Sequence, residues 1–333
     1  MGLRIGIVGA TGAVGREALR LLEEGDLSIS EMRLFASARS AAQSLSFRHE
    51  PVRVEEVSGE ALTGLDYVIF SAGSSVSRQY APVAAKGGAV VIDNSSAFRM
   101  ADDVPLVVPE VNAKALNRHA GIVANPNCTA AILATAVWPL HQAAVVERVV
   151  VATYQAASGA GAKALAELDA QVRQYVAGEA IQREVFPKQI AFNVFSHNSP
   201  VDEAGFNEEE NKVAQEIRKI FGEPNLGICA TCIRVPVFRA HSEAIVVETR
   251  RKLSAGEARE LLRHAPGVVV VDDRKTNSFP TPLDAAGKRE ILVGRLREDP
   301  SHPRSLALFV SGDQLLKGAA WNAVQILELL TTR

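Results

Sequence analysis

The sequence predicts an α/β protein of two domains, in which a doubly wound parallel sheet is followed by an α+β domain with a mostly antiparallel sheet. The chain opens with an apolar run, a glycine-rich turn and an amphipathic run, which is the order of a βα unit. The next strand-like runs are short and almost wholly apolar, as in a parallel sheet that is buried on both faces. With 333 residues, the chain is also longer than one hydrophobic core usually serves.

The opening segment predicts a dinucleotide-binding domain of the Rossmann type. An apolar run at residues 3–8 leads into Gly9, Gly12 and Gly15, and an amphipathic run follows to residue 22. Glycine lets the backbone approach a pyrophosphate, and the N-terminus of the next helix favours its negative charge. A tight turn without a ligand is the weaker alternative, because the glycines lie between a strand and a helix. The expected cofactor contacts in this loop are Gly9, Thr11, Gly12, Ala13 and Val14.

The end of the second expected strand, residues 32–37, favours NADP over NAD. NAD-binding domains usually carry an acidic residue there, which holds the ribose 2′-hydroxyl, but this segment has no Asp or Glu. Arg39 and Ser40 follow instead, and they suit a 2′-phosphate through charge-assisted hydrogen bonds. The alternative is an arginine that is simply solvated in a loop. The missing acid together with the arginine makes NADP the better prediction.

The remaining elements form two groups. Further strands of the first sheet are expected at residues 66–71, 89–93, 106–108 and 121–124. Longer strand-like runs then occupy residues 145–157, 227–238, 243–250, 267–272, 290–296 and 306–311. Helices are expected at residues 129–142, 162–176, 208–221, 255–264 and 314–330, the last of them packing on the first domain. The NADP-binding domain is thus expected to comprise residues 1–127 and 313–333, and the second domain residues 128–312.

Cys128 is the candidate nucleophile. It lies in the run NPNCT at residues 125–129, where a strand is expected to turn into a helix. The positive end of a helix dipole lowers the pKa of a thiol, and a thiolate can hold an acyl group as a thioester. A single cysteine can equally be a small buried apolar residue, so position alone leaves the two interpretations nearly balanced. Cys229 and Cys232 form a C-x-x-C without a second pair, and both are expected to be core residues rather than zinc or redox groups.

At this point the chain resembles the aspartate-semialdehyde dehydrogenases along essentially its whole length. The matching blocks, in chain order, are GATGAVG at residues 9–15, SARS at 37–40, SAGSSVS at 71–77, VIDNSSAFRM at 91–100, VVPEVN at 107–112, NPNCT at 125–129, YQAASGAG at 154–161, EENK at 209–212, IRVPVFRAHSEA at 233–244 and LLKGAAWNAVQI at 315–326. The joint occurrence of these blocks in this order is highly specific.

The resemblance implies a reductive dephosphorylation in two steps. Cys128 would attack the acyl carbon of 4-phospho-aspartate and release phosphate, and NADPH would then reduce the thioester to aspartate semialdehyde. His241 would be the general acid/base, which suits an imidazole that titrates near working pH. Without the matching context, a core histidine would be the better interpretation. The implied setting is cytoplasmic biosynthesis of lysine through diaminopimelate and of threonine, methionine and isoleucine.

The resemblance also assigns the binding residues. Arg234 would hold the substrate α-carboxylate, Glu209 its ammonium group, and Arg99 and Lys212 the phosphoryl group. Gln155 would place the acyl group near the nucleophile, so that the implied catalytic residues are Cys128, His241 and Gln155. Ser158, Gly159 and Gln314 would lie near the cofactor. From spacing alone, Glu209 and Lys212 could equally form a surface salt bridge.

Two positions depart from the family pattern, and two rival enzymes remain. Ala240 stands before His241 where glycine is expected, and Gln314 stands where asparagine is frequent. An N-acetyl-glutamyl-phosphate reductase would share the fold and the thioester, but NPGCY is expected at its nucleophile. A malonyl-CoA-type reductase also resembles this family. A non-catalytic paralogue is disfavoured, since Cys128 and His241 are both present.

Composition and charge limit the kinds of partner that this protein is expected to bind. The formal charge of -2 and the absence of a basic stripe argue against nucleic acid. No stretch is apolar and long enough to span a bilayer, and the first residues do not have the pattern of a signal peptide. Three cysteines fit a reducing cytosol, and no metal site is expected. The family resemblance implies a homodimer built through the second domain.

Overall fold

The computed structural model describes residues 2–332, and its contacts divide the chain into two compact units. The first unit combines Met1–Asn127 with Gly318–Arg333, and the second unit is Cys128–Lys317. The chain therefore passes from the first unit to the second at the peptide bond before Cys128, and it returns after Lys317.

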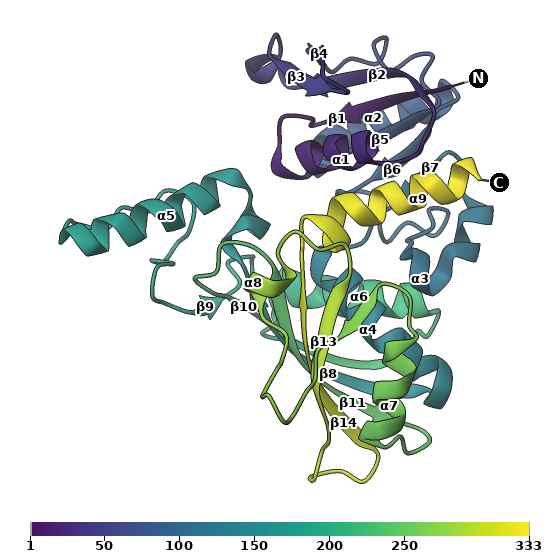
Figure 1. The fold of residues 1–333 in the computed structure, drawn as a ribbon. Coiled ribbons are helices and arrows are strands. Elements are labelled where there is room, and N and C mark those ends of the chain that lie inside the picture. Colours follow the sequence, from purple (N-terminus) through teal and green to yellow (C-terminus); the bar gives the residue numbers. More distant parts are fainter. Residues whose placement is uncertain (1, 333) are drawn as a thin grey trace. The chain divides into compact units, whose positions relative to one another are not determined.

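The first unit contains a seven-stranded sheet in the order β3-β4-β2-β1-β5-β6-β7 within the described residues (Figure 1). All neighbours pair in parallel except β3 and β4. The strands are β1 Leu3–Val8, β2 Ile29–Ala36, β3 Ser44–Phe47, β4 Glu50–Glu56, β5 Tyr67–Phe70, β6 Val90–Asp93 and β7 Ile122–Ala124. The helices are α1 Ala13–Glu24, α2 Ser74–Lys86, α3 Pro109–Asn112 and α9 Trp321–Thr331. The predicted doubly wound parallel sheet is confirmed.

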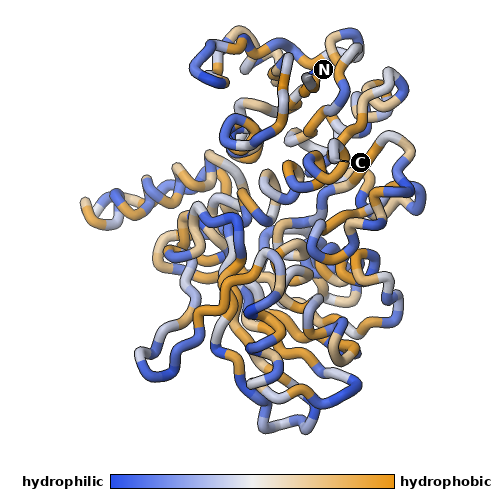
Figure 2. The backbone as a smooth tube through the Cα atoms, turned by 45° about the vertical axis from the view of Figure 1, so that its right-hand side comes forward, coloured by the Kyte–Doolittle hydropathy of each residue, from blue (hydrophilic) through white to orange (hydrophobic). Residues whose placement is uncertain are grey.

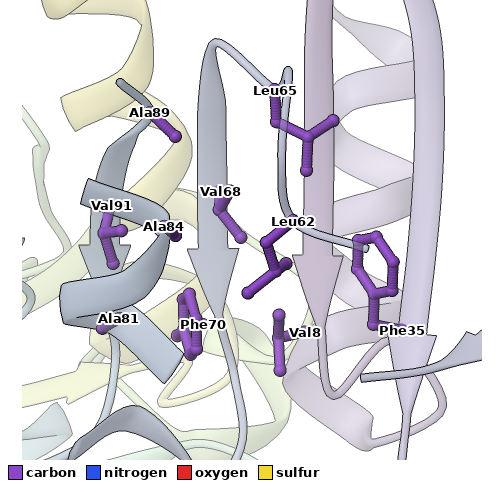
Figure 3. Packing of buried hydrophobic residues seen from close by; sticks show 10 residues of the cluster. All are labelled: Val8, Phe35, Leu62, Leu65, Val68, Phe70, Ala81, Ala84, Ala89 and Val91. Atoms are coloured by element: carbon purple, nitrogen blue, oxygen red, sulfur yellow. The ribbon is translucent and has the colours of Figure 1, made fainter. Parts of the chain in front are cut away.

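The apolar strands of this sheet build its core on both faces. Figure 3 shows one part, in which Val8 of β1, Phe35 of β2 and Phe70 of β5 meet side chains from α2 and from the loop before β5. Val8, Phe35 and Phe70 are at most 1% exposed. Burial of this kind stabilises a fold by about 1.5–3 kcal/mol for each large apolar side chain. The core therefore fixes where the carboxyl ends of β1 and β2 lie.

Two local predictions for the first unit were wrong or incomplete. The strand expected at residues 106–108 is only a single bridge between Leu106 and Ala124, because the prolines at positions 105 and 109 interrupt a longer ladder. The β3–β4 hairpin was not predicted. Its turn residues Arg48 and His49 both have positive φ, at 52° and 67°, without the Asn-Gly or Asp-Gly sequence that usually marks such a turn.

The second unit contains a seven-stranded sheet in the order β12-β13-β14-β11-β8-β10-β9 within the described residues. The pairs β12–β13 and β8–β10 are parallel and the other four are antiparallel, so the predicted, mostly antiparallel sheet is confirmed. The strands are β8 Val146–Gln155, β9 Phe195–Ser196, β10 Gly227–Arg234, β11 His241–Thr249, β12 Val268–Val270, β13 Ile291–Glu298 and β14 Ser305–Gly312. The helices are α4 Cys128–Ala144, α5 Ala162–Ala177, α6 Glu208–Phe221, α7 Ala255–Arg263 and α8 Pro282–Ala285.

Helix α4 is buried nearly all round and anchors the second unit. Every residue from Thr129 to Val137 is at most 1% exposed, and the helix contacts α6, α7 and four strands of the sheet. Figure 2 shows hydrophobic colour along the strands of this unit and hydrophilic colour in several of the loops that join them. A helix that is apolar on all faces belongs in a protein interior. Its first residue, Cys128, is therefore held by packing on every side of the helix.

The C-terminal helix α9 is tied into the first unit by buried amides. Asn322 donates to the carbonyl oxygen of Val107 at 2.9 Å and to Oδ1 of Asn125 at 2.6 Å. Asn125 in turn donates to Oδ1 of Asn94 at 2.8 Å and to the carbonyl oxygen of Ala319 at 3.2 Å. Asn322 and Asn125 are both completely buried. This network orders the segment that immediately precedes Cys128.

We expect Asn322→Ala to destabilise the protein by about 1–3 kcal/mol, because it leaves buried acceptors without their donor. Urea denaturation monitored by circular dichroism measures this loss. Gln79→Ala is the control, since Gln79 is exposed on α2 of the same unit and its loss should change stability by less than about 0.5 kcal/mol. Equal effects of the two substitutions would contradict the role of the network.

Candidate active site

Three strands of the second sheet bring Gln155, Arg234 and His241 side by side. Gln155 ends β8 and Arg234 ends β10, and the parallel register of these strands pairs the two residues directly. β11 begins at His241 and runs antiparallel to β8, and the pairing of Ser242 with Tyr154 sets His241 beside Gln155. All three side chains belong to residues that are at most 3% exposed. The sheet thus presents an amide, a guanidinium and an imidazole in one row.

Cys128 lies against this row at the start of α4. Its Sγ is 3.5 Å from Nε2 of His241, and its position at the helix N-terminus favours the thiolate. Nδ1 of His241 accepts a hydrogen bond from the backbone N–H of Ala156 at 3.0 Å. Burial lowers the pKa of His241 well below its usual value, and Arg234 and His197 add to this effect. A nucleophile and a hydrogen-bonding imidazole are therefore in contact.

Gln155 connects the row to helix α6. Its Nε2 donates to Oγ1 of Thr129 at 3.1 Å and to Oε1 of Glu209 at 3.3 Å. Glu209 lies in the first turn of α6, is 7% exposed, and receives support from Ser199, whose Oγ accepts its backbone N–H at 3.2 Å. The structure thus places the nearly buried carboxylate of Glu209 beside the row formed by Gln155, Arg234 and His241.

Arg234 is a buried cation with an uncommitted donor. Its Nη1 donates to the carbonyl oxygen of Ala156 at 3.0 Å, and its guanidinium lies over the ring of Phe186, 5.6 Å from the centroid. Its Nε is buried and has no hydrogen-bond partner among the described residues. A buried N–H without a partner costs free energy, so this donor suits a carboxylate ligand.

Lys212 forms an ion pair with a different glutamate from the one considered in the sequence. Its Nζ lies 2.6 Å from Oε1 of Glu208, which is one helical turn earlier and 54% exposed at its side chain. This contact lowers the pKa of Glu208. The two neighbouring glutamates therefore differ, because Glu209 bonds to Gln155 and Glu208 to Lys212.

Gly159 lies beside the imidazole of His241, and Gln314 links Ser158 to Ala240, the residue before that histidine. Gln314 accepts the backbone N–H of Ala240 at 2.8 Å and donates to the hydroxyl of Ser158. A Cβ on Gly159 would lie 2.9 Å from Cε1 of His241, so a side chain does not fit there. Ala240 has a φ of 73°, which is the left-handed region that favours glycine and costs another residue about 1–2 kcal/mol. This backbone conformation explains why glycine is expected before His241.

The glycine loop of the first unit has the shape of a phosphate cradle. Gly9 has a φ of 86°, and a Cβ on it would lie 2.6 Å from the carbonyl oxygen of Ser71. A Cβ on Gly15 would lie 2.2 Å from the carbonyl oxygen of Gly9. Helix α1 begins after Gly12 without a side-chain cap and without an acidic residue in its first turn. Its first backbone amides therefore suit an anion such as a pyrophosphate. The other expected contacts, Thr11, Ala13 and Val14, are partly exposed along this loop and first turn.

The two arginines of the first unit that the sequence singled out, Arg39 and Arg99, differ in their surroundings. Arg39 is exposed and lies with Ser40 in a 3₁₀ turn directly after β2. Because β2 pairs with β1, this turn follows the strand next to the one that leads into the glycine loop. Arg99 is 8% exposed, and it donates to the carbonyl oxygens of Asn125 at 2.9 Å and Asn94 at 2.7 Å.

Sequence reasoning missed several groups that the fold places near the row. His197 is one of them, since it bonds to Ser199 at 3.1 Å and its pKa is lowered by burial. Glu243 is another. It lies two residues after His241 on β11, is completely buried, and neither of its carboxylate oxygens has a hydrogen-bond partner among the described residues. Burial raises its pKa well above the usual value and so favours the neutral acid over the carboxylate. Its only sequence signal is a charged residue inside an apolar strand.

The other two cysteines lie on opposite faces of β10, as residues three apart on a strand do. Cys232 is buried, and burial raises the pKa of its thiol. Cys229 is exposed in this chain. The expectation that both are core residues is therefore right for Cys232 and wrong for Cys229.

Among the described residues, no group of three or more His, Cys, Asp or Glu side chains could hold a metal ion. Over the same residues, no helix has the length and apolarity that a membrane crossing requires.

The fold and this set of side chains define a semialdehyde dehydrogenase. A model described as "Semialdehyde dehydrogenase, NAD binding domain" matches residues 4–119, and one described as "Semialdehyde dehydrogenase, dimerisation domain" matches residues 137–317. The chain is 50% identical to an aspartate-semialdehyde dehydrogenase of Synechocystis sp., over 99% of this chain and 98% of that protein. It superposes on the crystal structure of aspartate semialdehyde dehydrogenase II from Vibrio cholerae with a TM-score of 0.96 and 41% identity, covering 100% of this chain and 99% of the other. The chain belongs to the aspartate-semialdehyde dehydrogenase family of oxidoreductases.

We expect Glu243→Gln to become more stable relative to the wild type as pH rises. The folded state keeps a proton on Glu243 that the unfolded state releases above its ordinary pKa of 4.5, so the wild type loses stability as pH rises above that value. The slope for one such group is at most about 1.4 kcal/mol per pH unit. Urea denaturation at pH 5 and pH 7.5 measures the difference, with exposed Glu203→Gln as the control. A difference that does not depend on pH would show that Glu243 ionises normally.

Proposed function

We propose that the chain catalyses the NADPH-dependent reductive dephosphorylation of L-aspartyl-4-phosphate to L-aspartate 4-semialdehyde through a thioester on Cys128. The observation that carries this proposal is the contact of Cys128 with His241 at the N-terminus of α4. The reaction would serve the biosynthesis of lysine through diaminopimelate and of threonine, methionine and isoleucine. Aspartate semialdehyde dehydrogenase II of Vibrio cholerae, which is 40% identical to this chain, has been crystallised complexed with ASA.

The first step is an acyl transfer to sulfur. The Cys128 thiolate attacks the acyl carbon, a carbon–sulfur bond forms, and the bond to the phosphoryl oxygen breaks with release of phosphate. Reduced nicotinamide supplies the hydride that converts the thioester to the aldehyde when the sulfur leaves. Gln155, whose amide is fixed by Thr129 and Glu209, is positioned to orient the acyl group.

The charges beside the nucleophile match the substrate. The Nε of Arg234 offers a buried donor for the α-carboxylate, and Glu209 offers a carboxylate for the ammonium group. Lys212 carries the cation proposed for the phosphoryl group, because its ammonium is paired only with an exposed carboxylate in the contacts described above. The assignment of Arg99 to the same group rests on the family resemblance alone.

The first unit supplies the cofactor site. Gly9, Gly15 and the uncapped start of α1 fit a pyrophosphate, since the close backbone packing at both glycines brings the loop against the first amides of the helix. Exposed Arg39, directly after β2, is the residue proposed to bind the 2′-phosphate of NADP. Ser158 and Gly159 are proposed to lie near the nicotinamide. Gln314 is committed to Ser158 and Ala240 in its own unit, so its effect on the cofactor would be indirect.

A homodimer through the second unit is part of the proposal. The family model for this unit is described as a dimerisation domain. The face of the sheet opposite the buried row carries Tyr154 and Phe309, whose rings are 6.3 Å apart and partly exposed in this chain. An aromatic pair that is half-buried on a sheet face suits an interface core.

We expect Cys128→Ser to abolish nearly all phosphate-dependent formation of NADPH from aspartate semialdehyde and NADP, because a hydroxyl is a far poorer nucleophile than a thiolate. Binding of NADP, measured by calorimetry, should be retained. Cys229→Ser is the matched control, since that cysteine is exposed on β10, and its activity should equal that of the wild type. A fully active Cys128→Ser enzyme would exclude the thioester, and a wild type without phosphate-dependent activity would exclude the proposed reaction.

We expect Lys212→Ala and Glu209→Ala to have different kinetic signatures. Lys212→Ala should lower kcat/KM for phosphate, and Glu209→Ala should lower kcat/KM for aspartate semialdehyde. Each loss should be about ten- to a hundredfold, because one charge-assisted contact is removed. Glu208→Gln is the control, since it breaks the ion pair of Lys212 and should cost less than about 1 kcal/mol of stability. If all three variants show wild-type kinetics, Lys212 and Glu209 act only in the helix.

A further inference from the structure

The guanidinium of Arg234 is held by uncharged groups. Arg234 is 3% exposed, and burial lowers the pKa of its side chain. Its Nη1 donates to the carbonyl oxygen of Ala156 at 3.0 Å, and its Cζ lies over the ring of Phe186, 5.6 Å from the centroid. The face of an aromatic ring attracts a cation at this distance, most strongly where water is excluded. The ring of Phe186 therefore offsets part of the cost of burying the charge.

An aromatic ring and a carboxylate would leave different parts of the guanidinium available. A carboxylate in the place of the ring would accept N–H groups in pairs, and it would occupy the edge that an anionic ligand needs. The ring of Phe186 instead attracts the cation through its π-electrons. Nε of Arg234 has no hydrogen-bond partner among the described residues. The contact with Phe186 thus stabilises the cation and leaves its Nε–H available to a carboxylate ligand.

Phe186 is placed beside Arg234 by its neighbours. Phe195 of β9 pairs with Arg234 of β10 in the antiparallel register, so both side chains lie on the same face of the sheet. The rings of Phe186 and Phe195 meet edge to face, with their centroids 5.9 Å apart. Phe186 is 3% exposed and belongs to a buried cluster with Ala157 and Leu168. Neighbours on β9 and on α5 therefore limit the movement of its ring.

The loop that carries Phe186 is held by a buried carboxylate of helix α5. Glu167 lies on α5 and is 7% exposed. Its Oε2 accepts the backbone N–H groups of Glu184, Val185 and Phe186. Its Oε1 accepts from Nε2 of Gln171, one turn further along α5, at 2.9 Å. Hydrogen bonds to a carboxylate are stronger than those between neutral groups. Helix α5 thus fixes the backbone of the residue that contacts Arg234.

We propose that Phe186 is a positioning residue for the α-carboxylate of the substrate. It holds the guanidinium of Arg234 through a cation–π contact, which keeps Nε–H of Arg234 available to that carboxylate, and Glu167 on α5 holds Phe186 in turn. The inference rests on the proposed function, in which Arg234 binds the α-carboxylate. It assigns a role in substrate binding to α5 and to the loop that follows it.

Fluorinated phenylalanines at position 186 test the contact with little change of shape. Each fluorine withdraws charge from the face of the ring and weakens its attraction for a cation. We expect the KM for aspartate semialdehyde to rise with each fluorine added, to about tenfold with three. The value of kcat and the KM for phosphate should change less than about twofold. A KM for aspartate semialdehyde that stays constant along the series, or an equal rise for phosphate, would overturn the proposal.

Glu167→Gln tests the support from α5. The amide group replaces one carboxylate oxygen by a donor, so the N–H groups of the loop lose a charged acceptor. We expect the KM for aspartate semialdehyde to rise about threefold or more, with the KM for phosphate unchanged. Asp169→Asn is the control, because Asp169 pairs with Arg173 at the exposed surface of the same helix and should keep wild-type kinetics. A wild-type KM in Glu167→Gln would contradict the support from α5.

Urea denaturation of the free protein gives a readout that needs no substrate. Trifluorophenylalanine at position 186 should lower the denaturation midpoint in the wild-type background. It should have little effect in Arg234→Met, which keeps the length of the side chain without its charge. Equal shifts in the two backgrounds would show that Phe186 acts only by packing, and would overturn the inference. A wild type that does not convert aspartate semialdehyde would instead contradict the proposed function, so the two failures are distinguishable.

Discussion

The register of β8 with its two neighbours is the constraint on which the site depends. Gln155 pairs with Arg234 on one side and lies next to His241 on the other, because β10 runs parallel to β8 and β11 antiparallel. A slip of one residue in either pairing would turn the side chains of that strand to the other face of the sheet. The buried helix α4 packs on the same sheet and sets Cys128 against His241. The packing of the whole second unit thus fixes the contact between Sγ of Cys128 and Nε2 of His241.

The electrostatics of the second unit follow from burial. Arg234 is a buried cation whose Nε has no hydrogen-bond partner among the described residues, whereas burial lowers the pKa of His241 and raises the pKa of Glu243 and so favours the neutral form of each. A negative charge that develops on Cys128 therefore meets a guanidinium and a helix N-terminus. Each of these is in place before substrate arrives, so little reorganisation accompanies the reaction.

The fold was predictable where the apolar pattern was regular. Most strands of both sheets follow from short apolar runs, and the helix at Glu208–Phe221 follows from its amphipathic pattern, whereas β3, β4 and β9 were not predicted. The β3–β4 hairpin was not predictable, since its turn uses Arg48 and His49 in conformations that sequence rules reserve for glycine and asparagine. The partner of Lys212 was likewise open, because Glu208 and Glu209 are both within reach on a helix.

The sequence by itself determined the kinds of chemical groups that this protein carries: a glycine loop before a helix, a cysteine at a helix start, and a family pattern that names an imidazole and two arginines. It could do so because these signals lie in short, local segments of chain. Only the tertiary structure decided how the groups act on one another. That Nδ1 of His241 faces the N–H of Ala156 and that Gln314 holds Ser158 depend on pairings between residues 85 and 156 positions apart. That Glu243 is buried without a hydrogen-bond partner among the described residues depends on how the sheet is covered. Such pairings depend on sheet register and helix packing, which no local pattern encodes.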